Sequence, residues 1–196
     1  MFDVLLDSWW IGPALWAAFY ISDYRMTIAG ARLYKAQSNV VFEGSYEITP
    51  GFQADVDALK TLSPRFVIYL AASTAYLGLV RWIASTSEIM FSLYGAVLGG
   101  LLLLQATIHI RHLRNWFMFS KGAGLMQGRL SYSRSLTLRM SAFELFLFAV
   151  LYFGLFIVTP SSFLLGGALL CAGKSVQHYR LARKQDIAAS GVVAIG

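Results

Sequence analysis

Polar side chains lie within or at the ends of long apolar segments of this sequence. An ionisable side chain near the centre of a membrane helix costs about 2.5–3.5 kcal/mol on insertion scales, so each such residue is a candidate for a functional role. We therefore predict a polar binding site made of Asp23, Thr27, Gln105, His109, His112, Glu144, Lys174 and His178.

The spacing of these residues predicts which of them share a helix face. Residues three and four positions apart lie on one face of an α-helix. Gln105, His109 and His112 follow this spacing. A second stripe consists of Tyr20, Asp23, Thr27, Gly30 and Tyr34. Arg25 and Arg32 fall on a different stripe, so we expect them to extend to lipid headgroups while the Asp23 stripe faces the bundle.

Two acids in apolar segments, Asp23 and Glu144, need partners in surroundings of low dielectric constant. Arg25 and Lys174 are candidate cations for Asp23, and Lys174 is also a candidate for Glu144. We interpret Asp23 as the functional acid because Thr27 shares its stripe. Glu144, which has apolar neighbours, is interpreted as the structural partner of Lys174.

The spacing His109-x-x-His112 is also found among metal ligands on helices, and Glu47, Asp23 or Glu144 could complete such a site. The alternative is that this basic helix end binds lipid headgroups. The sequence contains no Gly-x-Ser-x-Gly, no His-Glu-x-x-His, no phosphate-binding glycine loop and only one cysteine. It therefore identifies no cofactor and no catalytic residue.

The elements that must position these residues are membrane helices. Of 196 residues, 57% are hydrophobic and 13% are charged, whereas soluble domains have about 25% charged residues. Because the apolar residues form continuous runs, we predict an all-α, polytopic membrane helical bundle in one domain, residues 1–184, followed by a disordered tail, 185–196. Five segments are long enough to cross about 30 Å of hydrocarbon. They are residues 9–31, 64–86, 89–110, 140–158 and 162–179.

Basic residues predict the orientation of this bundle, because Lys and Arg accumulate on the cytoplasmic side of membrane proteins. With the N-terminus outside and the C-terminus in the cytoplasm, Arg81 is the only one of the 16 Lys and Arg residues that lies outside. The predicted location is a plasma membrane or a bacterial inner membrane.

The cytoplasmic loops predict the binding partners. Residues 111–139 combine basic and aromatic side chains without any acid, which favours anionic lipid headgroups over nucleic acid at a membrane. Small residues at Gly95, Gly99, Gly166 and Gly167 permit close helix contacts, either within the chain or in a homo-oligomer. A protein partner is also possible.

Two classes of function fit this pattern. The first is a small membrane subunit or scaffold whose basic cytoplasmic face binds lipid or a partner. The second is a small transporter or channel with a polar vestibule open to the cytoplasm, and an intramembrane metal-dependent or lipid-modifying enzyme is a further alternative. The first is favoured because a transport pathway needs polar groups across the whole membrane, and the outer part of the predicted bundle has almost none.

Overall fold

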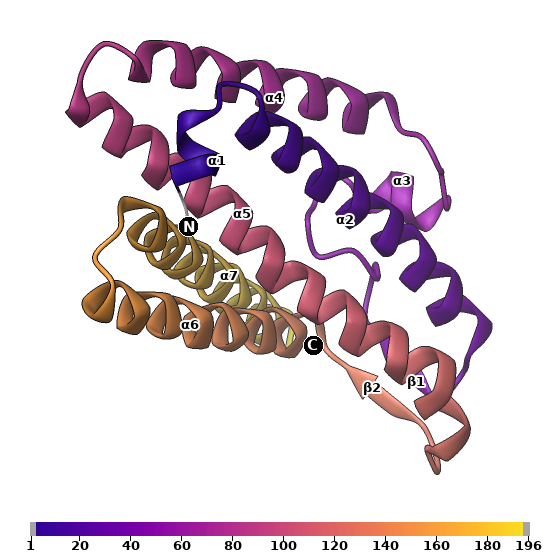
Figure 1. Ribbon diagram of the computed structural model, residues 1–196. Helices are drawn as coiled ribbons and strands as arrows, with labels where there is room; N and C mark the ends of the chain where they lie inside the picture. The colour runs from indigo at the N-terminus through magenta and orange to yellow at the C-terminus, as the bar shows by residue number, and fades with distance from the viewer. Residues whose placement is uncertain (1–2, 194–196) are drawn as a thin grey trace.

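The computed structural model describes residues 3–193, and most of them are helical (Figure 1). The helices are α1 (Asp3–Asp7), α2 (Ile11–Ala36), α3 (Gln53–Asp57), α4 (Pro64–Ala84), α5 (Glu88–Phe117), α6 (Arg134–Val158) and α7 (Ser162–Val193). Two short helical turns, η1 (Met118–Gly122) and η2 (Ala123–Leu125), follow α5, and two strands, β1 (Val40–Phe42) and β2 (Leu130–Tyr132), complete the fold.

Serine side chains fix the starts of three long helices. The Oγ atoms of Ser63, Ser87 and Ser133 accept hydrogen bonds from the first-turn N–H groups of α4, α5 and α6. Such caps satisfy N–H groups that have no partner within the helix. The predicted cap at Ser63 and the start of α4 at Pro64 are thus confirmed.

Three of the described helices are long and apolar enough to cross a membrane. They are Pro64–Ala84, Glu88–Gly122 and Arg134–Val158. α2, with 26 residues, and α7, with 32, are also long enough. However, polar residues such as Asp23 in α2 and Lys174 in α7 lower their hydropathy. The structure therefore supports a helical membrane protein with three candidate spanning helices.

α5 lies at the centre of the bundle and packs against α2, α4 and α7, while α6 packs against α7 (Figure 1). Glycines permit the closest of these contacts. A Cβ atom on Gly99 would overlap the backbone of Phe163, and one on Gly166 would overlap the backbone of Ala96. Gly95 and Gly167 likewise face Ser162 and Leu103. The predicted small-residue surfaces are therefore occupied within the chain, by α5 and α7 together.

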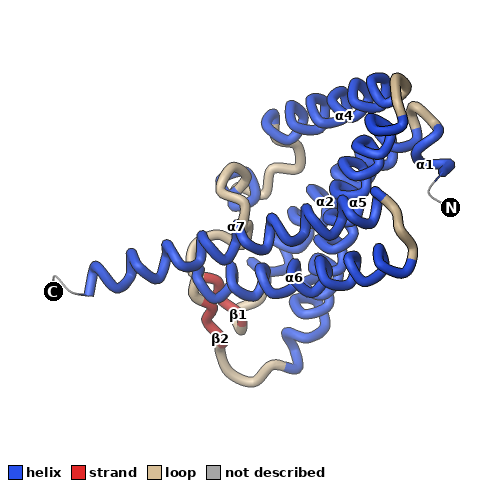
Figure 2. The backbone as a smooth tube through the Cα atoms, turned by 90° about the vertical axis from the view of Figure 1, so that its left-hand side faces the viewer, coloured by secondary structure: helices blue, strands red, loops and turns tan. Residues whose placement is uncertain are grey.

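The two ends of the bundle differ in construction. At one end, which we call the turn end, short turns join α4 to α5 and α6 to α7 (Figure 2). The opposite end, the loop end, carries α3 and a parallel pair of strands in which Val40 lies opposite Leu130 and Phe42 opposite Tyr132. These two strands were not predicted from the sequence.

Apolar side chains fill the bundle toward the turn end. A buried cluster there includes Leu6, Trp16, Leu77, Leu98 and Phe163, which come from α1, α2, α4, α5 and α7. Tyr94 is also completely buried in this cluster. The half of the bundle at the turn end is therefore a packed apolar core.

Two predicted boundaries are corrected by the structure. The chain after Gln185 was expected to be disordered, but α7 continues as a helix to Val193 and extends beyond the other helices (Figure 2). Residues 194–196 of that predicted tail lie outside the described part of the chain. The predicted basic loop 111–139 is also shorter, because α5 extends to Phe117 and α6 already begins at Arg134.

Candidate functional site

A cavity of about 300 Å³ lies at the loop end between α2, α5, α7 and the segment 46–52. We call it the polar chamber. Tyr20, Asp23, Tyr24 and Thr27 of α2 form one wall, and α5 contributes another wall that includes Ile108, Arg111 and His112. Three members of the predicted α2 stripe, Tyr20, Asp23 and Thr27, therefore line this chamber, while Arg25 and Arg32 are exposed. The other two members, Gly30 and Tyr34, pack against Tyr46.

Asp23 and His112 form the most direct contact between these two walls. His112 Nε2 lies 2.7 Å from Asp23 Oδ1, and Thr27 Oγ1 lies 3.3 Å from the same ring nitrogen. Gln105 Nε2 donates a hydrogen bond to Asp23 Oδ2 over 3.3 Å. The predicted partner of Asp23 was a cation, Lys174 or Arg25; the structure instead gives it a histidine, because Asp23 and Thr27 both face α5.

Two α5 residues of the chamber, Arg111 and His112, each have a buried polar atom without a partner among the described residues. Nδ1 of His112 and Nη2 of Arg111 are buried and have no hydrogen bond to any described residue. Buried polar groups in proteins normally have a protein, water or ligand partner. These two atoms therefore indicate where a bound polar molecule or water would make contacts.

His109 does not join His112 in a shared site. Its Nδ1 lies 2.7 Å from the carbonyl oxygen of Gln105, its ring packs edge-on against Phe19, and the two histidine ring centroids are 6.4 Å apart. Across residues 3–193, no group of three His, Cys, Asp or Glu side chains could hold a metal ion. The metal site considered for His109, His112 and Glu47 is therefore not formed in this structure.

Glu144 pairs with arginines of α5 and not, as predicted, with Lys174. Arg111 Nε donates to Glu144 Oε2 over 2.8 Å, and Arg114 Nη1 contacts Oε1. Lys174 Nζ turns to Gln177 on its own helix, 3.0 Å away. The prediction was wrong because Arg111 and Arg114 were expected in a headgroup-binding loop, whereas α5 continues as a helix through both residues to Phe117.

Residues 46–49 form part of the chamber wall, and the segment 43–49 that contains them is held by Arg134. The Arg134 guanidinium donates hydrogen bonds to the carbonyl oxygens of Ser45, Glu47 and Ile48, at 3.1, 3.1 and 2.7 Å. Tyr46 in this segment packs over Gly30 of α2, where a Cβ atom would overlap its hydroxyl oxygen. Arg134 therefore has a structural role, although its position in the basic segment suggested lipid contact.

Glu47 brings a second carboxylate to the chamber. Burial raises the pKa of the Glu47 carboxyl above its usual value of 4.5, and the nearby Asp23 raises it further. A hydrogen bond from the Thr49 N–H to Glu47 Oε1, 2.7 Å long, acts in the opposite direction. Removal of a carboxylate from water disfavours its charged form, so Glu47 binds its proton more tightly than an exposed glutamate.

α7 supplies the remaining polar wall. His178 and Lys174 both line the chamber, and His178 Nδ1 lies 2.8 Å from Ser141 Oγ of α6. Lys174 has no ion pair with a carboxylate among the residues that the structure describes. It is thus a cation of the chamber that is not already neutralised by a neighbour.

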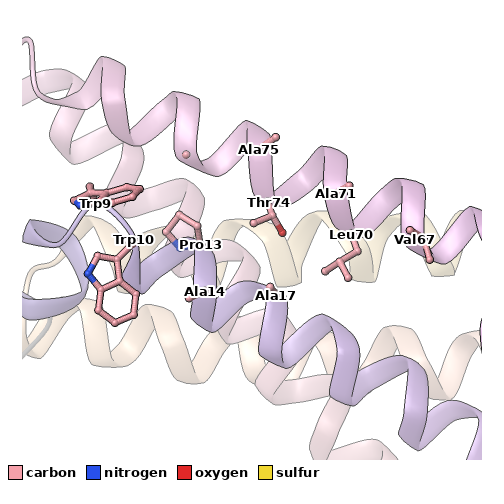
Figure 3. Close-up of a pocket in the computed structure, with 11 residues that line it drawn as sticks. Trp9, Trp10, Pro13, Ala14, Ala17, Val67, Leu70, Ala71, Thr74 and Ala75 are labelled. Atoms are coloured by element: carbon pink, nitrogen blue, oxygen red, sulfur yellow. The ribbon is translucent and has the colours of Figure 1, made fainter.

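A second, larger groove of about 680 Å³ lies between α2 and α4 (Figure 3). Trp9, Trp10 and Pro13 lie at one end, and Leu70 and Thr74 point from α4 toward α2 (Figure 3). Its walls carry no ionisable side chain. This groove offers no group for acid–base chemistry or for binding of a charged ligand, so the polar chamber is the candidate site.

The structure therefore brings together most of the residues predicted for the site. Asp23, Thr27, His112, Lys174 and His178 line the chamber. The other three do not line it: Gln105 donates a hydrogen bond to Asp23, His109 contacts the carbonyl oxygen of Gln105, and Glu144 pairs with Arg111. Arg111 was not predicted as a site residue, although Leu104, Ile108, Arg111 and Asn115 follow helical spacing on the lining face of α5. This spacing could have identified Arg111 as a residue of the chamber wall.

Comparisons with models of known protein families, with curated proteins and with solved structures give no match to this chain.

Proposed function

We propose that this chain is a multi-pass integral membrane subunit that binds a small organic anion in the polar chamber, from the cytoplasmic side. In this proposal α2, α4, α5, α6 and α7 all cross the membrane, with the N-terminus outside and the C-terminus inside, in a plasma or bacterial inner membrane. The distribution of Lys and Arg residues supports this orientation of the two termini, because basic residues accumulate on the cytoplasmic side of membrane proteins.

One observation carries the ligand class: the cavity is lined by the unneutralised Lys174 and by Arg111, whose Nη2 is buried without a partner among the described residues. Arginine and lysine at a cavity wall favour carboxylate or phosphate groups. The aromatic rings of Tyr20, Tyr24 and Phe66 on another wall supply apolar contact. Small-molecule sites commonly combine such an apolar surface with a few polar groups.

Binding is favoured over transport because of the packing beyond the chamber. The buried cluster around Trp16, Leu98 and Phe163 fills the bundle between the chamber and the turn end. A pathway for a polar solute needs lining groups that replace its water along the whole route. A binding subunit, by contrast, needs access from only one side.

Native mass spectrometry of the detergent-solubilised protein tests this proposal. We expect the wild-type protein to retain a small acidic molecule after mild extraction, and the Lys174→Met variant to lose it. Because no described carboxylate pairs with Lys174, this substitution leaves no buried acid without a partner and should keep the melting temperature.

Lys121→Met is the matched control, because Lys121 is exposed in η1 and does not line the chamber. It should retain the bound molecule at the wild-type level. The proposal is wrong if the wild-type protein carries no small molecule, or if Lys174→Met retains it as well as Lys121→Met does.

A further inference from the structure

A groove of about 500 Å³ follows the outer surface of the α6–α7 hairpin at the loop end. Two stripes at helical spacing form its walls. One consists of Arg139, Ala142, Phe143 and Phe146 on α6, and the other of Val176, Tyr179, Arg180 and Arg183 on α7. Neither stripe contains an acidic residue, and the groove is separate from the polar chamber.

The groove changes character along its length. Since α6 begins and α7 leaves the bundle at the loop end, Arg139, Arg180 and Arg183 all lie toward that end. Phe143, Phe146 and Val176 lie deeper along the hairpin, and each is about half exposed or more. A charged mouth therefore continues directly into an exposed apolar floor.

The arginines of this mouth have different surroundings. Arg139 is held in place by Asp186, 2.6 Å from its Nη2, and its guanidinium lies 5.5 Å from the centroid of the Tyr179 ring. Arg180 and Arg183 are exposed and form no ion pair with any described residue. Two guanidinium groups one helical turn apart are thus free to bind an anion.

We infer that this groove binds an anionic phospholipid, with its phosphate between Arg180 and Arg183 and an acyl chain along Phe143 and Phe146. The arrangement of basic residues at one end of the groove and apolar residues along the rest favours this ligand. Basic residues beside membrane helices attract anionic lipids of the cytoplasmic leaflet, and the adjoining apolar surface matches an acyl chain. A free phosphate would use only the mouth. The inference rests on the proposed insertion in the membrane but not on the ligand of the polar chamber.

Titration of the detergent-solubilised protein with phosphatidylglycerol and phosphatidylcholine, followed by native mass spectrometry, tests the inference. We expect tighter binding of phosphatidylglycerol, and a loss of roughly fivefold in affinity for each arginine removed in the pair Arg180→Gln and Arg183→Gln. The pair Arg180→Lys and Arg183→Lys keeps both charges and should retain most of the binding.

Arg25→Gln with Arg32→Gln is the matched control, because these arginines are also exposed but lie on α2, outside the groove. This pair should leave the affinity almost unchanged. Phe143→Ala with Phe146→Ala should weaken binding of the lipid, and inorganic phosphate should not displace it.

Equal affinities for the two lipids would overturn the inference, and so would displacement of the lipid by inorganic phosphate. An equal loss of affinity in Arg180→Gln with Arg183→Gln and in Arg25→Gln with Arg32→Gln would also overturn it. Lys174→Met separates it from the proposed function. That variant should lose the chamber ligand and keep the affinity for phosphatidylglycerol. Loss of lipid binding in Lys174→Met would contradict the independence of the two sites.

Discussion

His112 of α5 and Asp23 of α2, separated by 89 positions in the chain, meet with 2.7 Å between Nε2 and Oδ1. This contact joins the two helices where the polar chamber begins. Each residue also has a second polar neighbour, Thr27 for His112 and Gln105 for Asp23. The contact thus belongs to a small network, and substitutions of its members should not have additive effects.

A double-mutant cycle measures this coupling. Asp23→Asn and His112→Gln should each lower the free energy of unfolding, and their joint effect should differ from the sum by roughly 0.5–3 kcal/mol. Denaturant titration in detergent, followed by tryptophan fluorescence, provides the measurement. Asp23→Asn combined with Arg139→Gln is the control cycle, since Arg139 pairs with Asp186 on the outer side of the α6–α7 hairpin and shares no partner with Asp23. Additive effects are expected there. Additivity in the His112 cycle would show that the contact contributes no coupling.

The second prediction concerns the acid of α6. Arg111→Met removes the Nε donor of Glu144 and should destabilise the protein by roughly 1–3 kcal/mol, because a partly buried carboxylate loses a charged hydrogen bond. Adding Glu144→Gln to Arg111→Met should restore part of this loss. Lys174→Met should have no comparable effect.

Melting temperatures of these three variants, and of Lys174→Met combined with Glu144→Gln, distinguish this arrangement from the pairing expected from sequence. If Lys174→Met were as destabilising as Arg111→Met, and Glu144→Gln compensated for it, Lys174 would be the true partner of Glu144.

The difference between the expected partner of Glu144, Lys174, and the observed partners on α5 shows how far the sequence could predict the site. Helical spacing alone correctly placed Asp23 and Thr27 on one inward face of α2, because side chains three to four residues apart must lie together on a helix. The partner of Glu144 could not be predicted in this way. It depends on the rotation and depth of α5 relative to α6, which are set by packing between helices far apart in the chain.

The strands show the same limit in the fold. The long helices could be predicted because continuous apolar runs determine them locally. β1 and β2 contain only three residues each, and α3, α4 and α5 lie between Val40 and its partner Leu130 in the chain. Such short strands have no clear local pattern. Next to them the Arg134 N–H donates a hydrogen bond to Glu43 Oε2 over 3.1 Å, a contact between residues 91 positions apart that the sequence does not predict.

Glu47 predicts a pH dependence of stability. Its pKa is higher in the folded protein than the usual value of 4.5, so the folded state binds this proton more tightly than the unfolded state does. The corresponding stabilisation is fully present below pH 4.5 and is lost as the pH rises through the raised pKa. In Glu47→Gln, this decline should be absent.

Free energies of unfolding measured as a function of pH for the wild type, Glu47→Gln and Glu43→Gln test this prediction. Glu43 is exposed in the same segment and does not line the chamber, so Glu43→Gln should keep the wild-type decline. Identical pH profiles for the wild type and Glu47→Gln would contradict the burial of Glu47 over the chamber.

The most direct test of a polar chamber open to the cytoplasm is the reactivity of single cysteines on α5. Ile108→Cys places a thiol in the chamber wall, and Ile110→Cys places one on the outer face of the same helix, where Ile110 is 50% exposed. In the proposed arrangement this outer face contacts lipid. Both are made in a Cys171→Ser background; the native thiol is completely buried. Ile108→Cys should react with a water-soluble, negatively charged thiosulfonate applied from the cytoplasmic side, and faster than with a positively charged one, while Ile110→Cys stays unreactive. Reaction of Ile108→Cys only from the outside, or equal reactivity at both positions, would contradict the account.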